Sequence, residues 1–197
     1  MAAARRRLTF RACGREPMHN GLPDEIVTPR LVLRAPRAAD AADIYANIND
    51  WDVVSMIARP PWPYPRALAD EFVANAIGHV IESGGEVIGA VGIARRDAAP
   101  NLGFWIGKRH WGNGLMTEAA AAYVGAFFDT TSRDETVYSS YLVENPASWR
   151  VQEKLGFIAV ASCMLFNNAR GVELPGMQTL LRRSEFEARF GTAKARP

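Results

Sequence analysis

Residues 108–119 read KRHWGNGLMTEA and join an apolar run to a stretch of helix-forming residues. Gly112 and Gly114 let the backbone turn sharply or approach a ligand closely. A helix N-terminus leaves backbone N–H groups unpaired and carries partial positive charge, so a loop placed there can bind an anion such as phosphate. The same two glycines also fit an ordinary turn into a helix. The stretch therefore predicts a strand, a loop and a helix, with the loop serving either as an anion cradle or as a turn.

Two common phosphate-binding loops do not fit this stretch. A Walker A loop ends in Gly-Lys-Ser/Thr, whereas Gly114 is followed by Leu115 and Met116. The dinucleotide-binding fingerprint needs a third glycine where Thr117 stands, and it normally follows the first strand of a domain. Both alternatives are excluded by the residues present.

Hydrophobic periodicity predicts the elements around the loop. Alternating or continuous apolar runs predict strands over residues 30–36, 79–82, 87–94, 102–107, 135–144, 157–166 and 176–183. Helical spacing predicts helices over residues 38–48, with Asp40 as N-cap, and over 66–79, 115–128 and 145–156. Because hairpins are antiparallel and strand–helix–strand units are parallel, we expect one α/β domain with a mixed central sheet of about six to seven strands flanked by about four helices.

Composition narrows the class of partner. Residues 1–37 carry eight Arg and three acidic residues, a net charge of +5, whereas the other 15 basic and 18 acidic residues give −3. The main body is therefore not expected to bind nucleic acid. Cys13 and Cys163 suggest neither a disulfide framework nor a metal site, which fits a cytoplasmic protein. The apolar run at residues 155–166 is too short to cross a membrane.

The two ends of the chain are expected to lie outside the domain. Several Arg and no acid precede Glu16, a composition that also occurs in organellar targeting segments. We expect residues 1–24 to be a disordered tail, or the result of a start codon assigned too early, with Met18 as the functional start. The domain is expected over residues 25–185, followed by a C-terminal tail over residues 186–197.

A second motif, ENPASWRVQEKLGF at residues 144–157, follows the glycine loop after one predicted strand. Together with TPRLVLRAP at residues 28–36 and RHWGNG at residues 109–114, it resembles the GCN5-related N-acetyltransferase (GNAT) superfamily, in particular its RimJ/RimL-like branch. The resemblance covers roughly residues 28–183. Arg109, Gly112 and Gly114 stand at the positions of the superfamily's Q/R-x-x-G-x-G/A pyrophosphate loop.

The resemblance implies an acyltransferase that uses acetyl-CoA as cosubstrate and needs no metal. It implies that backbone N–H groups of residues 109–114 hold the pyrophosphate. The pantetheine arm would bind the strand at 102–106, where that strand splays from its parallel neighbour at 137–143 and opens the CoA cleft. The implied cofactor contacts are Phe104, Trp105, Ile106, Arg109, His110, Trp111, Gly112, Asn113, Gly114, Asn145, Ser148 and Lys154.

Three residues are candidates for the chemistry. Ser148 lies in the first turn of a predicted helix, where it either is a solvated serine or donates a hydrogen bond to the departing thiolate. Asn145 suits the N-cap of that helix, before Pro146, and the resemblance adds a contact with pantetheine or substrate. Glu144 is the nearest candidate base, although a solvated strand-end carboxylate explains it equally well.

The acceptor is expected to be a primary amine, either the α-amine of a protein N-terminus or a small-molecule amine. Many relatives place a Glu on the strand before the loop, near the point where Asn101 stands here, and no acid lies between Asp97 and Glu118. An α-amine, with a pKa of about 7.7–8.0, needs less help from a base than a lysine amine of pKa about 10.4. The missing acid motivates one alternative, a non-catalytic CoA-binding sensor or interaction module on the same fold. We expect a monomer or a homodimer.

Overall fold

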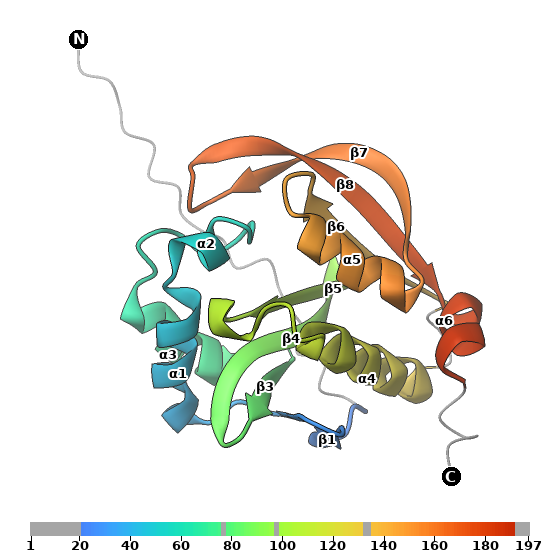
Figure 1. Cartoon of the computed structure of the whole chain (residues 1–197), viewed down its shortest axis with the longest axis horizontal. Helices are drawn as coiled ribbons and strands as arrows, with labels where there is room; N and C mark the ends of the chain where they lie inside the picture. Colours follow the sequence, from blue (N-terminus) through green and yellow to red (C-terminus); the bar gives the residue numbers. More distant parts are fainter. Residues whose placement is uncertain (1–20, 76–77, 97–98, 132–134, 192–197) are drawn as a thin grey trace.

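The computed structural model describes residues 21–75, 78–96, 99–131 and 135–191. Its strands form one sheet in the order β1-β2-β3-β4-β5-β6-β8-β7. The strands are β1 Glu25–Val27, β2 Val32–Arg34, β3 His79–Ser83, β4 Glu86–Arg96, β5 Ala99–Ile106, β6 Thr136–Leu142, β7 Ile158–Asn167 and β8 Val172–Arg182. The helices are α1 Ala41–Ile48, α2 Trp51–Val54, α3 Arg66–Asn75, α4 Leu115–Thr130, α5 Pro146–Leu155 and α6 Arg183–Phe190, with short 3-10 turns η1 Ala38–Asp40 and η2 Lys108–His110 (Figure 1).

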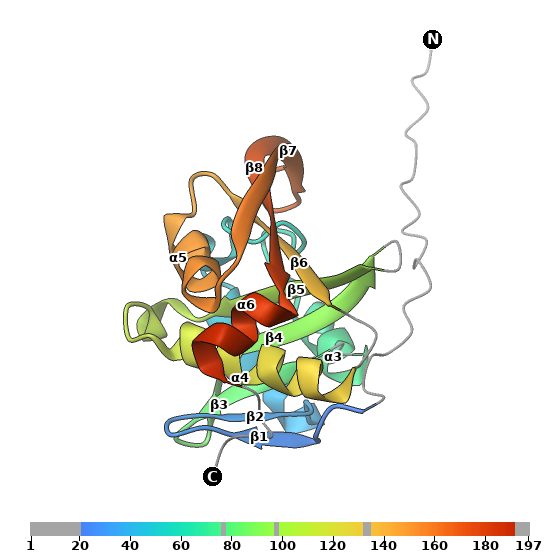
Figure 2. The same ribbon diagram turned by 90° about the vertical axis from the view of Figure 1, so that its right-hand side faces the viewer.

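The sheet is mixed, as the order of elements predicts. Strands β5 and β6 run parallel and are joined through α4, whereas the other neighbouring strands pair in antiparallel fashion. The strand after α5, β7, does not lie beside β6, because β8 is inserted between them and pairs with both. Figure 2 shows the β7–β8 hairpin rising beyond the rest of the sheet.

Two apolar cores lie on opposite faces of the sheet. Helices α1 and α3 pack with Val80 and Val87 of the sheet in one core. Helices α4, α5 and α6 contribute Tyr123, Leu155 and Phe186 to the other. The predicted apolar face of α4 is confirmed, since its members are all buried: Met116, Ala120, Tyr123 and Phe127. The central strands are thus covered on both faces, and the loops at their ends start from this packed sheet.

Both expected element counts are too low. The described residues form eight strands and six α-helices, against an expected six to seven strands and four helices. Strand β1 has three residues and α2 has four, so neither is long enough to show a hydrophobic period. Helix α6 buries only Phe186, which leaves almost no apolar stripe to recognise.

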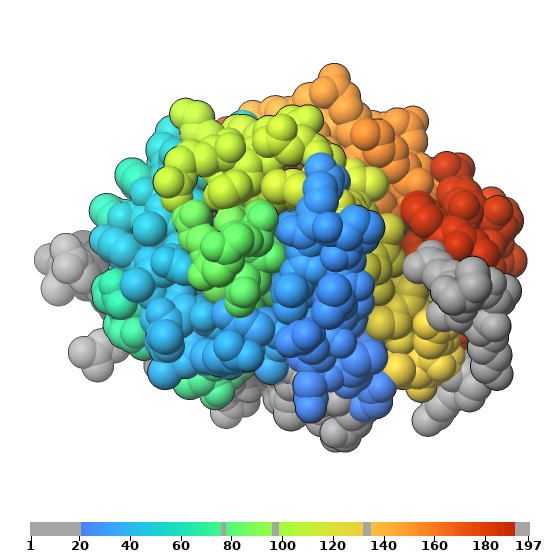
Figure 3. Space-filling model, turned by 60° about the horizontal axis from the view of Figure 1, so that its bottom comes forward, coloured from blue at the N-terminus to red at the C-terminus, as the bar shows by residue number. Residues whose placement is uncertain are grey.

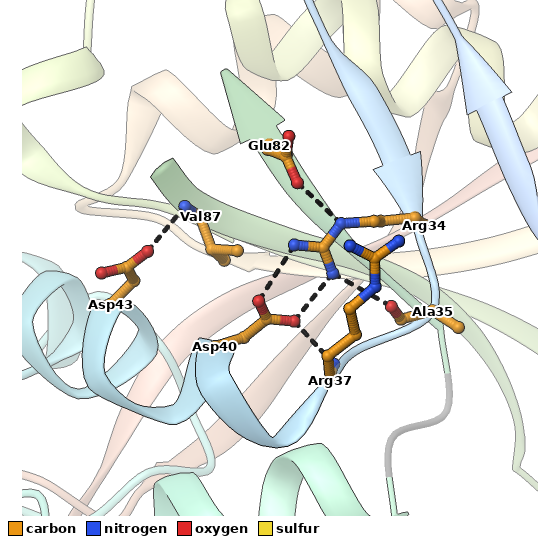
Figure 4. A network of polar contacts seen from close by, with 7 residues as sticks. All are labelled: Arg34, Ala35, Arg37, Asp40, Asp43, Glu82 and Val87. Atoms are coloured by element: carbon orange, nitrogen blue, oxygen red, sulfur yellow. Dashed lines mark hydrogen bonds and ion pairs between the residues drawn. The ribbon is translucent and has the colours of Figure 1, made fainter. Parts of the chain in front are cut away.

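Asp40 occupies the predicted N-cap position of α1, but its side chain makes no capping hydrogen bond. The carboxylate is bound instead by the buried guanidinium of Arg34, at 2.8 and 2.9 Å, and by the backbone N–H of Arg37 (Figure 4). Arg34 Nε also donates to Glu82 Oε2 at 2.7 Å, which links β2 to β3. Burial raises the pKa of Asp40, but the bonds from Arg34 and Arg37 outweigh it, so the pKa of Asp40 is lowered.

The expected domain limits fall partly outside the described residues. Residues 1–20 of the expected N-terminal tail and residues 192–197 of the expected C-terminal tail lie outside the described residues. Helix α6 crosses the expected limit at residue 185, and its Phe186 is buried against Phe128 at a ring-centroid separation of 5.7 Å. The division of the chain into domain and tails stays a prediction.

Candidate functional site

The two sequence motifs meet at one edge of the sheet. Strands β5 and β6 run parallel, so their carboxyl ends lie at the same edge. The glycine loop, residues 107–114, follows β5, and the segment 143–148 follows β6 and begins α5. Open α/β sheets bind ligands outside the carboxyl ends of such strands, which makes this edge the candidate site.

The parallel strands β5 and β6 pair over a short distance only. Asn101 is paired with Tyr138, and Ser139 Oγ donates to the carbonyl of Leu102 at 3.0 Å. Further along, among the described residues, β5 is paired with β4 but has no ladder partner on β6, whose residues 136–142 pair with β8. The expected splay between these two strands is therefore present.

The splay exposes one backbone position of β5. Successive residues of a strand direct their N–H and C=O groups to opposite edges. The carbonyl of Leu102 faces β6, and the carbonyl of Ile106, on the same edge, accepts a bond from Trp111 Nε1 at 2.9 Å. By the same alternation, Phe104, midway between them, directs its N–H and C=O toward the β6 side, beyond the pairing of Asn101 with Tyr138.

The glycine loop has the backbone that its sequence predicts. Gly112 and Gly114 have φ of 78° and 73°, in the left-handed region where a β-branched residue is strained. Asn113 Nδ2 donates to the carbonyl of Trp111 at 3.1 Å and braces the loop from within. Helix α4 begins at Leu115, so its first N–H groups face outward at the end of the loop. This backbone is compatible with both roles that the sequence allows, an anion cradle and a turn into the helix.

The basic side chains of the loop are paired with carboxylates. Lys108 Nζ lies 2.5 Å from Asp52 Oδ2, and Arg109 Nη2 lies 2.7 Å from Glu86 Oε1. His110 has a buried Nε2 with no hydrogen-bond partner among the described residues. The cradle consequently offers backbone N–H groups more readily than free cationic side chains.

Asn145 caps helix α5, as predicted. Its Oδ1 accepts a hydrogen bond from the backbone N–H of Ser148 at 3.0 Å, Pro146 takes the first helical position, and Gly156 ends the helix with φ of 103°. The amide nitrogen of Asn145 points elsewhere and donates to the carbonyl of Met56 at 3.4 Å. Asn145 thus ties the start of α5 to the segment between α2 and α3.

The hydroxyl of Ser148 is held by a buried polar chain that the sequence did not reveal. Gln152 Nε2 donates to Ser148 Oγ at 3.2 Å, and Gln152 Oε1 accepts from Thr179 Oγ1 at 2.6 Å. Gln152 and Thr179 are fully buried. Because Gln152 supplies a donor, the proton of Ser148 remains available for an acceptor in the site.

The remaining candidates lie around this centre. Glu144 Oε1 is bound by Arg170 Nη1 of the β7–β8 turn at 2.5 Å, and both residues remain partly solvent-accessible. Lys154 is exposed in the last turn of α5, about 9 Å along the helix from Ser148 at 1.5 Å per residue. On β5, Phe104 packs against the α4 core and Trp105 against the α1–α3 core. Asn101 Nδ2 donates a hydrogen bond to the carbonyl of Ala99 at 3.1 Å.

The segment after α2 is fastened beside the site by two asparagines of the β7–β8 hairpin. Asn167 Nδ2 donates to the carbonyl of Ser55 at 2.8 Å, and Asn168 Nδ2 donates to that of Arg59 at 2.5 Å. Near this segment, Trp51 and Trp62 meet edge to face at 5.5 Å, and both are partly exposed. Nearby Tyr64, by contrast, is a core residue.

Within the part of the chain that the structure describes, no group of three or more His, Cys, Asp or Glu side chains is arranged to hold a metal ion. In the same ranges, no helix has the length and apolar character needed to cross a bilayer.

Comparison with known proteins gives a family and a fold. The family model described as "Acetyltransferase (GNAT) domain" matches residues 30–158. No curated protein sequence matches the chain. The acetyltransferase (GNAT family) from Bacillus anthracis has a TM-score of 0.71 at 18% identity, covering 82% of this chain and 99% of that one.

Two further solved structures share the fold. Mycobacterium smegmatis RimJ in complex with CoA-disulfide has a TM-score of 0.69 at 19% identity, covering 83% of this chain and 89% of its own. The microcin C7 self-immunity acetyltransferase MccE, in complex with acetyl-CoA and AMP, has a TM-score of 0.68 at 16% identity. The match covers 79% of this chain and 93% of MccE.

Proposed function

Because the chain belongs to the GNAT acetyltransferase domain family, we propose that it transfers an acetyl group from acetyl-CoA to a primary amine by direct attack in a ternary complex. The acceptor is either the α-amine of a protein N-terminus or a small-molecule amine. The observation that carries the proposal is the junction at one sheet edge of a glycine cradle, a splayed strand pair and the capped start of α5.

The residues present fit CoA. The loop at residues 112–114 presents backbone N–H groups for a pyrophosphate, and Phe104 presents an N–H and a C=O to the amides of a pantetheine arm. Two proteins of the same fold were solved with acetyl-CoA or a CoA disulfide, which supports this assignment. Within the family, we place the chain with the RimJ/RimL-like proteins on its three sequence motifs.

Ser148 and Asn145 are assigned to the reacting end of the site. When bound, acetyl-CoA supplies a thioester whose carbon–sulfur bond breaks as the bond to the amine nitrogen forms. Ser148 donates a hydrogen bond toward the sulfur, aided by the positive end of α5. A serine hydroxyl is far less acidic than a thiol, so Ser148 stabilises the thiolate and the proton that the thiolate takes up comes from water. Asn145 holds Ser148 in place through the cap, and its amide nitrogen is assigned the further contact with pantetheine or substrate.

The class of amine acceptor that we propose depends on the lack of an unpaired carboxylate base at the two candidate positions, Asn101 and Glu144. The position of Asn101 carries no carboxylate, and Glu144 is already bound by Arg170. An acceptor that is partly neutral near pH 7.5, such as an α-amine, needs no strong base to lose its proton. Glu144 is the base we assign where the acceptor requires one, acting in exchange with its Arg170 contact. A lysine-like amine is correspondingly expected to react more slowly.

The proposal is tested by thiol release and CoA binding together. Incubation with acetyl-CoA and a panel of peptides and small amines is expected to release free CoA thiol with at least one acceptor. Gly112→Val is expected to raise the Kd for CoA at least about tenfold, because the cradle cannot keep its left-handed backbone. Gly84→Val is the matched control, since Gly84 also has positive φ, at 60°, and open space around it.

Three outcomes are decisive. Equal effects of the two glycine variants on CoA binding would show that the loop is only a turn. CoA binding without thiol release from any acceptor would favour the CoA-binding sensor over the enzyme. Absence of CoA binding by the unmodified chain would overturn both functions.

A further inference from the structure

The β1–β2 hairpin reaches the glycine loop from a distant part of the sequence. Figure 3 shows the blue N-terminal hairpin lying against the yellow-green loop and the start of α4. The turn of this hairpin carries Thr28 and Arg30, and neither residue belongs to the loop motif. Arg30 makes three hydrogen bonds there, two to Glu118 and one to the backbone of Asn113.

Glu118 joins the hairpin to the first turn of α4. Its Oε1 accepts from Thr28 Oγ1 at 2.7 Å and from the backbone N–H of Arg30 at 3.0 Å, and its Oε2 accepts from Arg30 Nε at 2.6 Å. Burial raises the pKa of Glu118, but the bonds from Thr28 and Arg30 outweigh it, so the pKa is lowered. The Glu118 carboxylate is thus kept ionised, and the positive charge of Arg30 compensates its negative charge close to the proposed anion site.

The third bond of Arg30 orients a peptide of the cradle. Arg30 Nη1 donates to the carbonyl of Asn113 at 2.8 Å, so this carbonyl points toward Arg30. In a planar trans peptide the carbonyl and the following N–H point in opposite directions. The N–H of Gly114 is therefore directed away from Arg30.

Arg30 also lies on the side of Gly114 where a Cβ atom would project. Its Nη2 is 3.7 Å from the place where a Cβ of Gly114 would be. The left-handed conformation of Gly114 is compatible with many loop shapes, and glycine alone does not select one. A fixed external donor restricts the peptide to a single orientation before the ligand arrives, which lowers the entropic cost of binding.

We propose that Arg30 is the positioning residue of the anion cradle: anchored on Glu118, it holds the Asn113–Gly114 peptide with its N–H presented to a pyrophosphate-bearing ligand. The inference rests on the proposed function, because the ligand is CoA. Arg30 acts through the backbone and not as a direct partner of the phosphate. Its charge is already compensated by Glu118, and its bond to the loop is made on the side opposite to the N–H.

The shape of the arginine side chain is essential to this role. Nε and Nη1 donate at the same time to Glu118 and to the loop, which a planar guanidinium allows. A lysine ammonium keeps the charge but does not present donors in a fixed fork. Arg30→Lys therefore separates positioning from charge.

The test compares Arg30→Ala, Arg30→Lys and Arg66→Ala with the unmodified chain. Arg66 is an exposed arginine of α3 that pairs only loosely with Asp70, at 4.0 Å, so its removal changes charge equally without touching the loop. The Kd for CoA is measured by titration calorimetry at several salt concentrations, well below each variant's Tm. Both Arg30 variants are expected to weaken binding about tenfold or more, with Arg66→Ala unchanged.

Two further readouts identify positioning. The salt dependence of log Kd is expected to stay the same in Arg30→Lys, because the positive charge that compensates Glu118 is kept. Where turnover is measured, KM for acetyl-CoA is expected to rise while kcat at saturation is unchanged, since Arg30 touches no reacting group.

Other results overturn the inference. An unchanged Kd in Arg30→Ala, with or without a lower Tm, would leave Arg30 a purely structural residue. Wild-type affinity in Arg30→Lys would show that a positive charge at position 30 is sufficient, and it would overturn the positioning role. If the unmodified chain itself fails to bind CoA, the proposed function fails first, and that result is distinct from both.

Discussion

Ser148 receives its orientation from inside the protein. The chain from Thr179 through Gln152 to Ser148 begins on β8 and ends at the start of α5, and its two inner members are fully buried. A buried amide that loses one of its partners costs free energy, so the chain is held in one arrangement. In that arrangement the Gln152 amide donates to Ser148 and leaves the serine proton for the site.

At the residue scale we expect Ser148→Ala to lower kcat about 10- to 100-fold, the size expected when one hydrogen bond to a charged group is lost. Gln152→Glu is expected to lower kcat as well, because a carboxylate oxygen accepts the serine proton and withdraws it from the site. Steady-state kinetics with free-thiol detection provide the measurement, with Kd for CoA as the control. An unchanged kcat in Ser148→Ala would remove Ser148 from the chemistry.

Helix α5 connects the candidate catalytic residues to the segment between α2 and α3. Its N-cap Asn145 accepts from Ser148 N–H with one end of the amide and donates to the Met56 carbonyl with the other. The sequence allowed two roles for Asn145, a cap alone or a cap with a further contact. The structure confirms the cap, and it shows that the amide nitrogen reaches toward the segment beside the site.

At the element scale, Asn145→Ser distinguishes these roles, because serine keeps a capping oxygen but has no amide nitrogen. Asn145→Ala is expected to lower the free energy of unfolding by about 1 kcal/mol, and Asn145→Ser to restore most of it. Activity is expected to stay low in both variants, since both lose the amide nitrogen. Thermal unfolding and kcat/KM are the measurements. Full activity in Asn145→Ser would assign Asn145 to the cap alone.

The whole molecule contains buried ionisable groups that set its range of pH stability. The pKa values of Asp40 and Glu118 are lowered by the hydrogen bonds that outweigh their burial. Burial raises the pKa of Tyr64 to about 12, with a contribution from Glu71, and the pKa of Tyr123 to about 12. Tyr64 and Tyr123 lie in different cores, and the two tyrosines act at the opposite end of the pH scale from the two carboxylates.

We expect Tm to be highest at intermediate pH and to fall at both ends. Below the unfolded carboxyl pKa of about 4, the stabilisation from Asp40 and Glu118 is lost as pH falls through their lowered folded pKa values. Above the unfolded tyrosine pKa of about 10, unfolding releases protons, so stability is lost as pH rises toward 12. Calorimetry across pH is the measurement, and Tyr123→Phe is expected to flatten the alkaline fall. An unchanged alkaline slope in Tyr123→Phe would contradict this origin.

Local patterns in the sequence were sufficient for most elements. The spacing of Met116, Ala120, Tyr123 and Phe127 predicted the buried face of α4, and the order Asn145, Pro146, Gly156 predicted both ends of α5. Such signals succeed because capping and amphipathicity involve residues a few positions apart. The elements that were missed are short or bury a single side chain, so no period could mark them.

The sequence by itself determined the α/β class, the glycine loop with its following helix, and the capped start of α5, since each depends on neighbours along the chain. Only the tertiary structure decided which groups surround them. Arg30 and Glu118 are 88 residues apart, and Gln152 and Thr179 are 27 apart, so no local spacing connects either pair. The fold brings them together because the sheet places β1–β2 beside α4 and inserts β8 next to β6, and hydrogen bonds depend on that proximity in space.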